Sequence, residues 1–123
     1  MSFQEDALRT EAPITPEILE RISQNPRLIH CILGLASEIG EFADQLKKHI
    51  FYGKPLDKVN LMEELADNQW YAAQGFDAVG YEMEDAQNRV INKLKVRYPD
   101  KFNQHDATHR DLDKERKELE TNL

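Results

Sequence analysis

The sequence predicts an all-α protein: a four-helix-bundle-like subunit whose core is built by oligomerisation. Apolar residues recur at alternating intervals of three and four over long segments, which is the period of an amphipathic helix. The five glycines and five prolines fall mainly between these segments, where helices would be joined by short turns. No segment shows a strand pattern, and 123 residues fit one domain.

The first predicted helix is short. Thr15 can cap its N-terminus and Pro16 suits the first helical position, because proline lacks only an N–H that is unpaired there anyway. We expect this helix to end near Asn25 and Pro26.

The second predicted helix covers residues 27–52. Gly53 is the expected C-cap, and Pro55 prevents the helix from continuing. Its apolar positions are Leu28, Ile32, Leu35, Ile39, Phe42, Leu46 and Ile50.

The third predicted helix follows a cap at Asp57, runs through Val79 and ends at Gly80. One apolar row contains Leu61, Leu65, Ala72, Phe76 and Val79, and a second contains Met62, Ala66, Trp70 and Ala73. A helix that is apolar on two sides needs cover on two sides. We therefore expect another subunit to supply part of that cover.

The fourth predicted helix covers residues 82–98 and ends before Pro99. Residues 1–102 are expected to form the domain. Residues 103–123 are expected to form a charged C-terminal tail containing a loop and a peripheral or frayed helix. A partner-binding arm or a lid is the alternative for this tail.

The composition of the chain argues against several classes of function. The net charge of −7 argues against a nucleic-acid binder, which usually has a basic footprint. No apolar run is long enough for a membrane span, and residues 1–10 lack the apolar stretch of a signal peptide. Cys31 is the only cysteine, so we expect a reducing, cytoplasmic location.

Two pairs of acidic residues stand out on the second and third predicted helices. Glu38 and Glu41 are three residues apart, as are Glu64 and Asp67, so each pair projects from one helix face. The turn at Gly53 is short, so the helices should be antiparallel. Both pairs then lie at similar heights, and four carboxylates point at one small volume.

Such a cluster repels itself, and a divalent cation would relieve the repulsion. All-oxygen ligands favour Mg²⁺, with Mn²⁺ as a possible substitute. Because Mg²⁺ often shares its ligands with substrate phosphates, the predicted site points to phosphoryl chemistry.

Other interpretations account for parts of this pattern. Acidic pairs three residues apart arise easily among 23 acids and often only form surface ion pairs. A di-iron bundle requires Glu-x-x-His pairs, and no histidine lies three residues after a glutamate. A non-catalytic acidic helical interaction or oligomerisation protein would explain the helices and the charge, but not carboxylates framed by apolar residues.

The acidic pairs, 22 residues apart, resemble the signature of the MazG-like all-α NTP pyrophosphohydrolases, in the form found in single-domain phage and bacterial members. Residues 34–41 are similar to the first motif of that family, and residues 51–55 to a loop of its single-domain members. Residues 92–102, with the ending Lys-x-x-x-Arg-Tyr-Pro, are similar to its closing segment. The resemblance extends over residues 25–102.

This resemblance implies hydrolysis of a nucleoside triphosphate between its α and β phosphates, with Mg²⁺ held by the four carboxylates. It also implies a homodimer or homotetramer. Some family members carry a further glutamate where this chain has Ser37, so this departure from the family pattern leaves the water-activating base open. Glu38 is our first candidate for the residue that activates water, and Glu41 is the second.

Substrate contacts are expected from three regions. Arg89, Lys93 and Arg97 form one cationic stripe on the fourth helix; Lys93 and Arg97 also fall in the family motif, whereas Asp85 could pair with Arg89. A solvated basic face is the alternative for the stripe. The other candidates for contacts to phosphate, base or sugar are Lys54 in the turn, Trp70, Tyr71 and Asn92. Trp70 and Tyr71 could instead belong to the packing.

Overall fold

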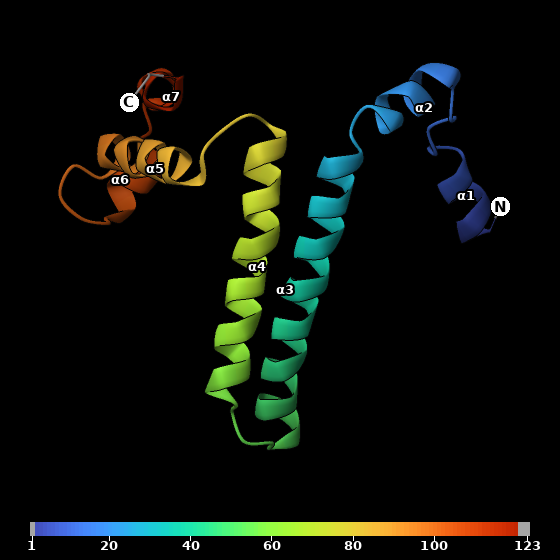
Figure 1. The fold of residues 1–123 in the computed structure, drawn as a ribbon, viewed down its shortest axis with the longest axis horizontal. Coiled ribbons are helices and arrows are strands. Elements are labelled where there is room, and N and C mark those ends of the chain that lie inside the picture. The colour runs from blue at the N-terminus through green and yellow to red at the C-terminus, as the bar shows by residue number, and fades with distance from the viewer. Residues whose placement is uncertain (1, 121–123) are drawn as a thin grey trace.

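The computed structural model describes residues 2–120, which contain seven helices and no strand, so the all-α class is confirmed. The three longest helices form the middle of the chain, and four short ones flank them (Figure 1). In chain order the helices are α1 (Phe3–Leu8), α2 (Pro16–Ser23), α3 (Pro26–Tyr52), α4 (Lys58–Ala78), α5 (Met83–Arg97), α6 (Gln104–Thr108) and α7 (Leu112–Glu120).

The long hairpin of α3 and α4 has the boundaries that its capping residues predict. Gly53 ends α3 with φ of 68°, a left-handed conformation that favours glycine. The side chain of Asp57 accepts a hydrogen bond from the backbone N–H of Asn60 and caps α4. The caps thus fix where the two helices face each other.

Two glycines allow α3 and α4 to approach closely. A Cβ at Gly34 would collide with the ring of Tyr71, and a Cβ at Gly75 would lie 2.6 Å from Sγ of Cys31. That thiol donates a hydrogen bond to the carbonyl oxygen of Tyr71 at 3.2 Å. The pairing of the two helices therefore depends on small side chains and an aromatic ring packed over them.

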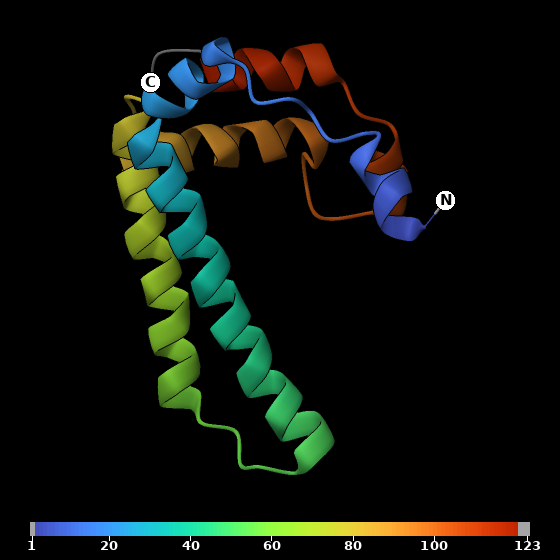
Figure 2. The ribbon, with the colours of Figure 1, turned by 90° about the vertical axis from the view of Figure 1, so that its right-hand side faces the viewer.

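The remaining helices leave the hairpin in two directions (Figure 1). On one side α1 and α2 precede α3. On the other side α4 ends at a turn in which Gly80 has φ of 84°, and α5 then lies crosswise at the end of the hairpin with α7 packed on it (Figure 2). Within one chain α3 thus packs on α4, and α5 packs on α7.

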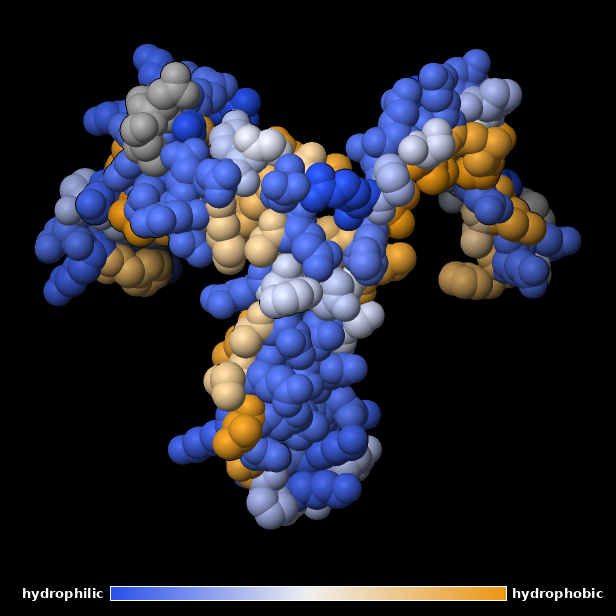
Figure 3. All heavy atoms as spheres, in the orientation of Figure 1, coloured by the Kyte–Doolittle hydropathy of each residue, from blue (hydrophilic) through white to orange (hydrophobic). Residues whose placement is uncertain are grey.

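The open arrangement leaves little core inside one chain. Among residues 2–120, Cys31 is the only large or medium apolar side chain that is buried. The chain exposes 10045 Å², whereas a compact monomer of 14.3 kDa is expected to expose about 6,800 Å². Apolar residues reach the surface on both arms and along one edge of the hairpin (Figure 3).

Both ends of the described chain contain helices. Helix α1 was not among the predicted ones, although its capping box is visible in the sequence: Ser2 accepts from the N–H of Glu5, and Glu5 accepts from the N–H of Ser2. In the tail, α7 is a helix that packs on α5. None of the helices in the described part of the chain is long and apolar enough to cross a membrane.

Candidate metal centre

Three glutamates converge where α3 and α4 face each other. Glu38 and Glu41 come from α3 and Glu64 from α4, and one carboxylate oxygen of each lies within 4.8 Å of the other two. Glu64 is 7% exposed, Glu38 is half-buried and Glu41 is exposed. The group thus extends from inside the hairpin to its surface, where a ligand can enter.

The neighbouring carboxyl groups raise the pKa of Glu64. The carboxyl hydrogen bond between Glu64 and Glu38 is the largest cause of a pKa of Glu64 that is raised from 4.5 to about 8. Burial of Glu64 and its hydrogen bond and charge interaction with Glu41 raise this pKa further. The cluster therefore takes up a proton more readily than an isolated carboxyl group does.

The cluster also contains oxygen atoms without a partner. Oε2 of Glu38 and Oε2 of Glu64 are buried and accept no hydrogen bond from the described residues. A buried acceptor without a donor is costly. A divalent cation bound to these oxygens would satisfy both and remove the repulsion, so the donor set fits Mg²⁺ or Mn²⁺.

Asp67, the fourth predicted ligand, lies one turn after Glu64 on α4 and is half-buried. Its carboxylate is outside the group of three converging oxygens. The side-chain Nδ2 of the following residue, Asn68, donates a hydrogen bond to the carbonyl oxygen of Glu64. Asp67 is thus placed next to the cluster without being part of it.

The predicted base and sugar contacts are distributed along the hairpin. Tyr71 packs on Gly34 and makes an edge-to-face contact with His30, with ring centroids 5.9 Å apart. Trp70 is 70% exposed on the outside of α4. Lys54 is exposed in the turn, where its carbonyl oxygen lies 2.7 Å from Nδ1 of His49. Of these residues, only Tyr71 is anchored by packing.

Two of the three cations in the stripe of α5 already have partners within the chain. Nε of Arg89 pairs with Asp85 at 2.9 Å, the alternative already visible in the sequence, and Nη1 of Arg89 donates to the carbonyl oxygen of Leu119 at 2.7 Å. Arg97 pairs with Glu115 of α7 at 2.7 Å. Lys93 is half-buried and makes no ion pair within residues 2–120.

Asn92 lies on a different part of α5. It lines a shallow groove beside Val96 and Lys114, between α5 and α7. This groove contains none of the converging glutamates, so Asn92 does not join them within one chain.

Within a single chain, the cationic stripe of α5 also lies away from the converging glutamates of α3 and α4. Helix α4 continues for 14 residues after Glu64 before it ends at Ala78, which corresponds to about 21 Å along the helix axis. Helix α5 then crosses the end of the hairpin instead of running back along it (Figures 1 and 2). The carboxylates and the cations therefore form two separate regions of one subunit.

Two charged residues of the second region were not among the predicted ones: Arg110 and Glu115. Arg110 donates two hydrogen bonds to Glu115, at 3.1 and 2.8 Å. Both residues lie in the charged tail, where they have no apolar frame and no periodic signal to distinguish them.

The fold and the site define an all-α protein with a helical hairpin whose three converging carboxylates are compatible with binding a divalent cation. A sequence model of the MazG nucleotide pyrophosphohydrolase domain matches residues 28–102, more than half of the chain. The chain belongs to this family, which implies a nucleotide substrate and a divalent metal. Comparisons with curated proteins and with solved structures found no significant match.

Proposed function

We propose that this protein is a Mg²⁺-dependent nucleoside triphosphate pyrophosphohydrolase that converts a (deoxy)nucleoside triphosphate and water to the monophosphate and diphosphate. Its role would be to control or clean the nucleotide pool. The observation that carries the proposal is the cluster of Glu38, Glu41 and Glu64 inside a chain of the MazG family. Two buried oxygens of this cluster accept no hydrogen bond from residues 2–120.

The carboxylates have two roles in the proposed reaction: they bind the cation, and one of them activates water. Glu38, Glu41 and Glu64 would hold the cation, with Asp67 as a further ligand one turn away. When bound, Mg²⁺ would neutralise negative charge on the triphosphate. Glu38, or else Glu41, orients the attacking water and accepts its proton as the water oxygen bonds to the α-phosphorus. The bond between the α-phosphorus and the bridging oxygen breaks, and diphosphate leaves.

The phosphate contacts would come from Lys93 and Arg97. Because α5 lies at the far end of its own hairpin, these cations reach a carboxylate cluster most directly if a second subunit supplies them. Trp70, Tyr71, Asn92 and Lys54 remain candidates for contacts to base, sugar or phosphate. Among them, Tyr71 has the least freedom because its ring packs on Gly34.

A homo-oligomer, either a dimer or a tetramer, is part of the proposal. One chain exposes 10045 Å², which exceeds the expectation for a compact monomer of its size by about 3,200 Å². Interfaces of obligate homodimers bury roughly 2,000–5,000 Å² in total, about half of it from each partner. The excess surface of one chain is therefore at least as large as its share of such an interface, so it can accommodate a permanent partner.

The test is a panel of ribo- and deoxyribonucleoside triphosphates incubated with and without Mg²⁺, with the products identified. We expect equimolar monophosphate and diphosphate from at least one substrate, only with the metal. A preference for damaged bases would indicate pool cleaning, and a preference for one ordinary base would indicate pool control. Release of orthophosphate, or no product from any substrate, would contradict the proposed activity.

A further inference from the structure

Glu115 is the most deeply buried charged residue of the described chain, with 3% of its side chain exposed. Its Oε1 accepts from Nε of Arg97 at 2.7 Å, and its Oε2 accepts from Nε and Nη2 of Arg110 at 3.1 and 2.8 Å. Both carboxylate oxygens are therefore held by guanidinium groups. The two arginines form an anion-binding site, and Glu115 is the anion in it.

The two arginines of this site can bind anions other than a carboxylate. Guanidinium groups bind phosphate and carboxylate with the same planar, charge-assisted hydrogen bonds. Arg97 belongs to the segment matched by the family, whereas Arg110 and Glu115 lie beyond its last residue at 102. The family motif thus contributes Arg97, and the C-terminal tail adds a second arginine, Arg110, and the carboxylate of Glu115.

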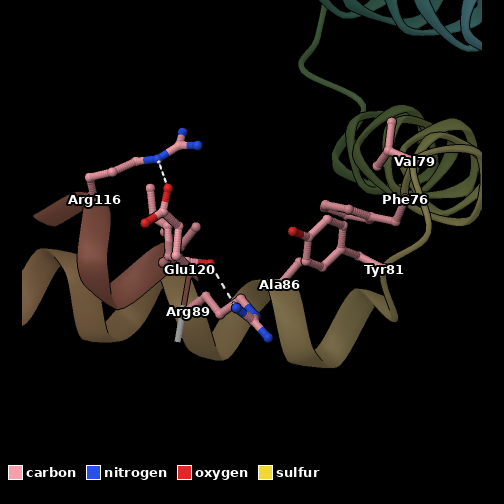
Figure 4. Close-up of a pocket in the computed structure, with 9 residues that line it drawn as sticks. Phe76, Val79, Tyr81, Ala86, Arg89, Arg116 and Glu120 are labelled. Atoms are coloured by element: carbon pink, nitrogen blue, oxygen red, sulfur yellow. Dashed lines mark hydrogen bonds and ion pairs between the residues drawn. The ribbon is translucent and has the colours of Figure 1, made fainter. Parts of the chain in front are cut away.

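A second contact holds the same helix on the stripe. Nη1 of Arg89 donates to the carbonyl oxygen of Leu119, and the Arg89 side chain is 10% exposed. Figure 4 shows Arg89 on α5 pointing toward α7. Helix α7 is therefore tied to α5 at Arg89 and at Arg97, two turns apart. Between these two points lies Lys93, the third cation of the stripe.

We propose that Arg97 and Arg110 form a phosphate-binding site that α7 occupies with Glu115, and that the triphosphate chain of a substrate displaces Glu115 from it. This inference rests on the proposed function, because that function supplies the class of ligand. Helix α7 is then an internal competitor for substrate.

The composition of α7 suits a helix that can be displaced. Most of its residues are charged, Leu112 is exposed and Leu119 is only half-buried, so few apolar contacts hold it. Its attachment depends on the buried carboxylate, whose desolvation opposes the attraction of the two arginines. A triphosphate carries more negative charge than one carboxylate and can replace it.

Because α7 competes for the site, the apparent affinity for phosphate equals the intrinsic affinity multiplied by the fraction of molecules in which the site is free. If α7 occupies the site in about nine molecules of ten, removal of its anion raises the affinity roughly tenfold. Glu115→Gln removes the charge while keeping the shape of the side chain. Glu118→Gln is the matched control, because it removes one charge from the same helix at a residue without an ion pair in the described chain.

The experiment uses inorganic tripolyphosphate and the full-length protein in EDTA, so that it does not depend on metal or turnover. Titration calorimetry should show tighter binding by roughly tenfold in Glu115→Gln, no change in Glu118→Gln and a loss of binding in Arg97→Gln. In the wild-type protein, tripolyphosphate should also speed the amide hydrogen exchange of residues 112–120. This second measurement needs no variant to fold.

Equal affinities of the wild-type and Glu115→Gln proteins would overturn the inference, as would unchanged exchange in α7 with tripolyphosphate bound. If a nucleoside triphosphate is hydrolysed with Mg²⁺ but tripolyphosphate leaves α7 undisturbed, only this inference fails. If tripolyphosphate releases α7 but no triphosphate is hydrolysed, the proposed function fails and the anion site stands.

Discussion

Glu64 shows how one residue can link stability to ligand binding. It is buried between two other glutamates, keeps one oxygen unpaired and has a pKa raised to about 8 by its neighbours. Each of these features is unfavourable for the empty protein. Each would be relieved by a divalent cation, so the site stores unfavourable interactions that metal binding can release.

The first prediction concerns the loss of this ligand. Glu64→Gln keeps the volume of the side chain but removes its charge, so Mg²⁺ should bind more weakly and turnover should fall by about 100-fold or more. Glu63→Gln, which changes the adjacent exposed residue on α4, is the control and should retain activity. Diphosphate release measures turnover, and the Mg²⁺-induced rise in melting temperature measures binding. Near-normal values in Glu64→Gln would remove Glu64 from the site.

The second prediction concerns pH. Because the folded-state pKa of Glu64 lies above its usual 4.5, its proton stabilises the metal-free fold fully below pH 4.5, and this stabilisation is lost as pH rises through about 8. The melting temperature of the protein in EDTA should therefore fall over that range more in the wild type than in Glu64→Gln, which cannot ionise. Parallel pH curves for the two proteins would contradict the raised pKa.

The third prediction compares two glycines of α3. Gly34→Ala places a Cβ against the ring of Tyr71 and should destabilise the protein by about 1–3 kcal/mol. Gly40→Ala has no atom within 4 Å of the added Cβ and should stabilise the helix by roughly 0.5–1 kcal/mol. Urea denaturation of both variants measures the difference. Equal effects would mean that Tyr71 does not pack on Gly34.

At the scale of the helices, local capping chemistry made most boundaries predictable. Thr15, Gly53, Asp57 and Gly80 mark helix ends in the sequence and mark them in the structure. Helix α1 could also have been predicted from Ser2 and its capping box. These signals are readable because a cap and its partner lie within a few residues of each other.

Contacts between distant segments were less predictable. The convergence of Glu38, Glu41 and Glu64 followed from helix period and turn length alone. The partner of Arg97 did not, because Glu115 is 18 residues away in a segment where acidic residues are common. Charge patterns show that a cation needs a counter-ion, but they do not show which of many acids folds back to it.

The fourth prediction concerns the attachment of α7. Arg97 and Arg110 hold the pKa of Glu115 below its usual 4.5. The stabilisation from this ion pair is therefore present above pH 4.5 and is lost as pH falls through the lower, folded-state pKa. Amide exchange in residues 112–120 should accelerate on acidification, after correction for the intrinsic exchange rate.

The control for this prediction is Glu115→Gln. In this variant the exchange of α7 should already be faster at neutral pH and should depend less on acidification. If α7 in the wild-type protein kept its protection below the pH at which carboxylates titrate, contacts other than the ion pair would hold it.

For the whole molecule, the sequence indicated that one chain lacks a complete core, since the third helix is apolar on two sides. It did not reveal how open the chain is. The hairpin and the pair of α5 and α7 each bury some surface, yet large apolar side chains remain exposed on both. Such a shape depends on how successive helices leave their turns, which the apolar period of each helix does not specify.

The fifth prediction tests whether a second copy covers this surface. Ile32 is 60% exposed on an apolar face of α3, and a glutamate there would carry a charge into a dimer interface at a cost of the order of several kcal/mol. Light scattering should give the wild type a multiple of 14.3 kDa and Ile32→Glu a smaller mass. Ser37→Glu, on the polar face of the same helix, should keep the wild-type mass. A wild-type protein that stays monomeric at the concentrations of the assay would contradict the proposed homo-oligomer.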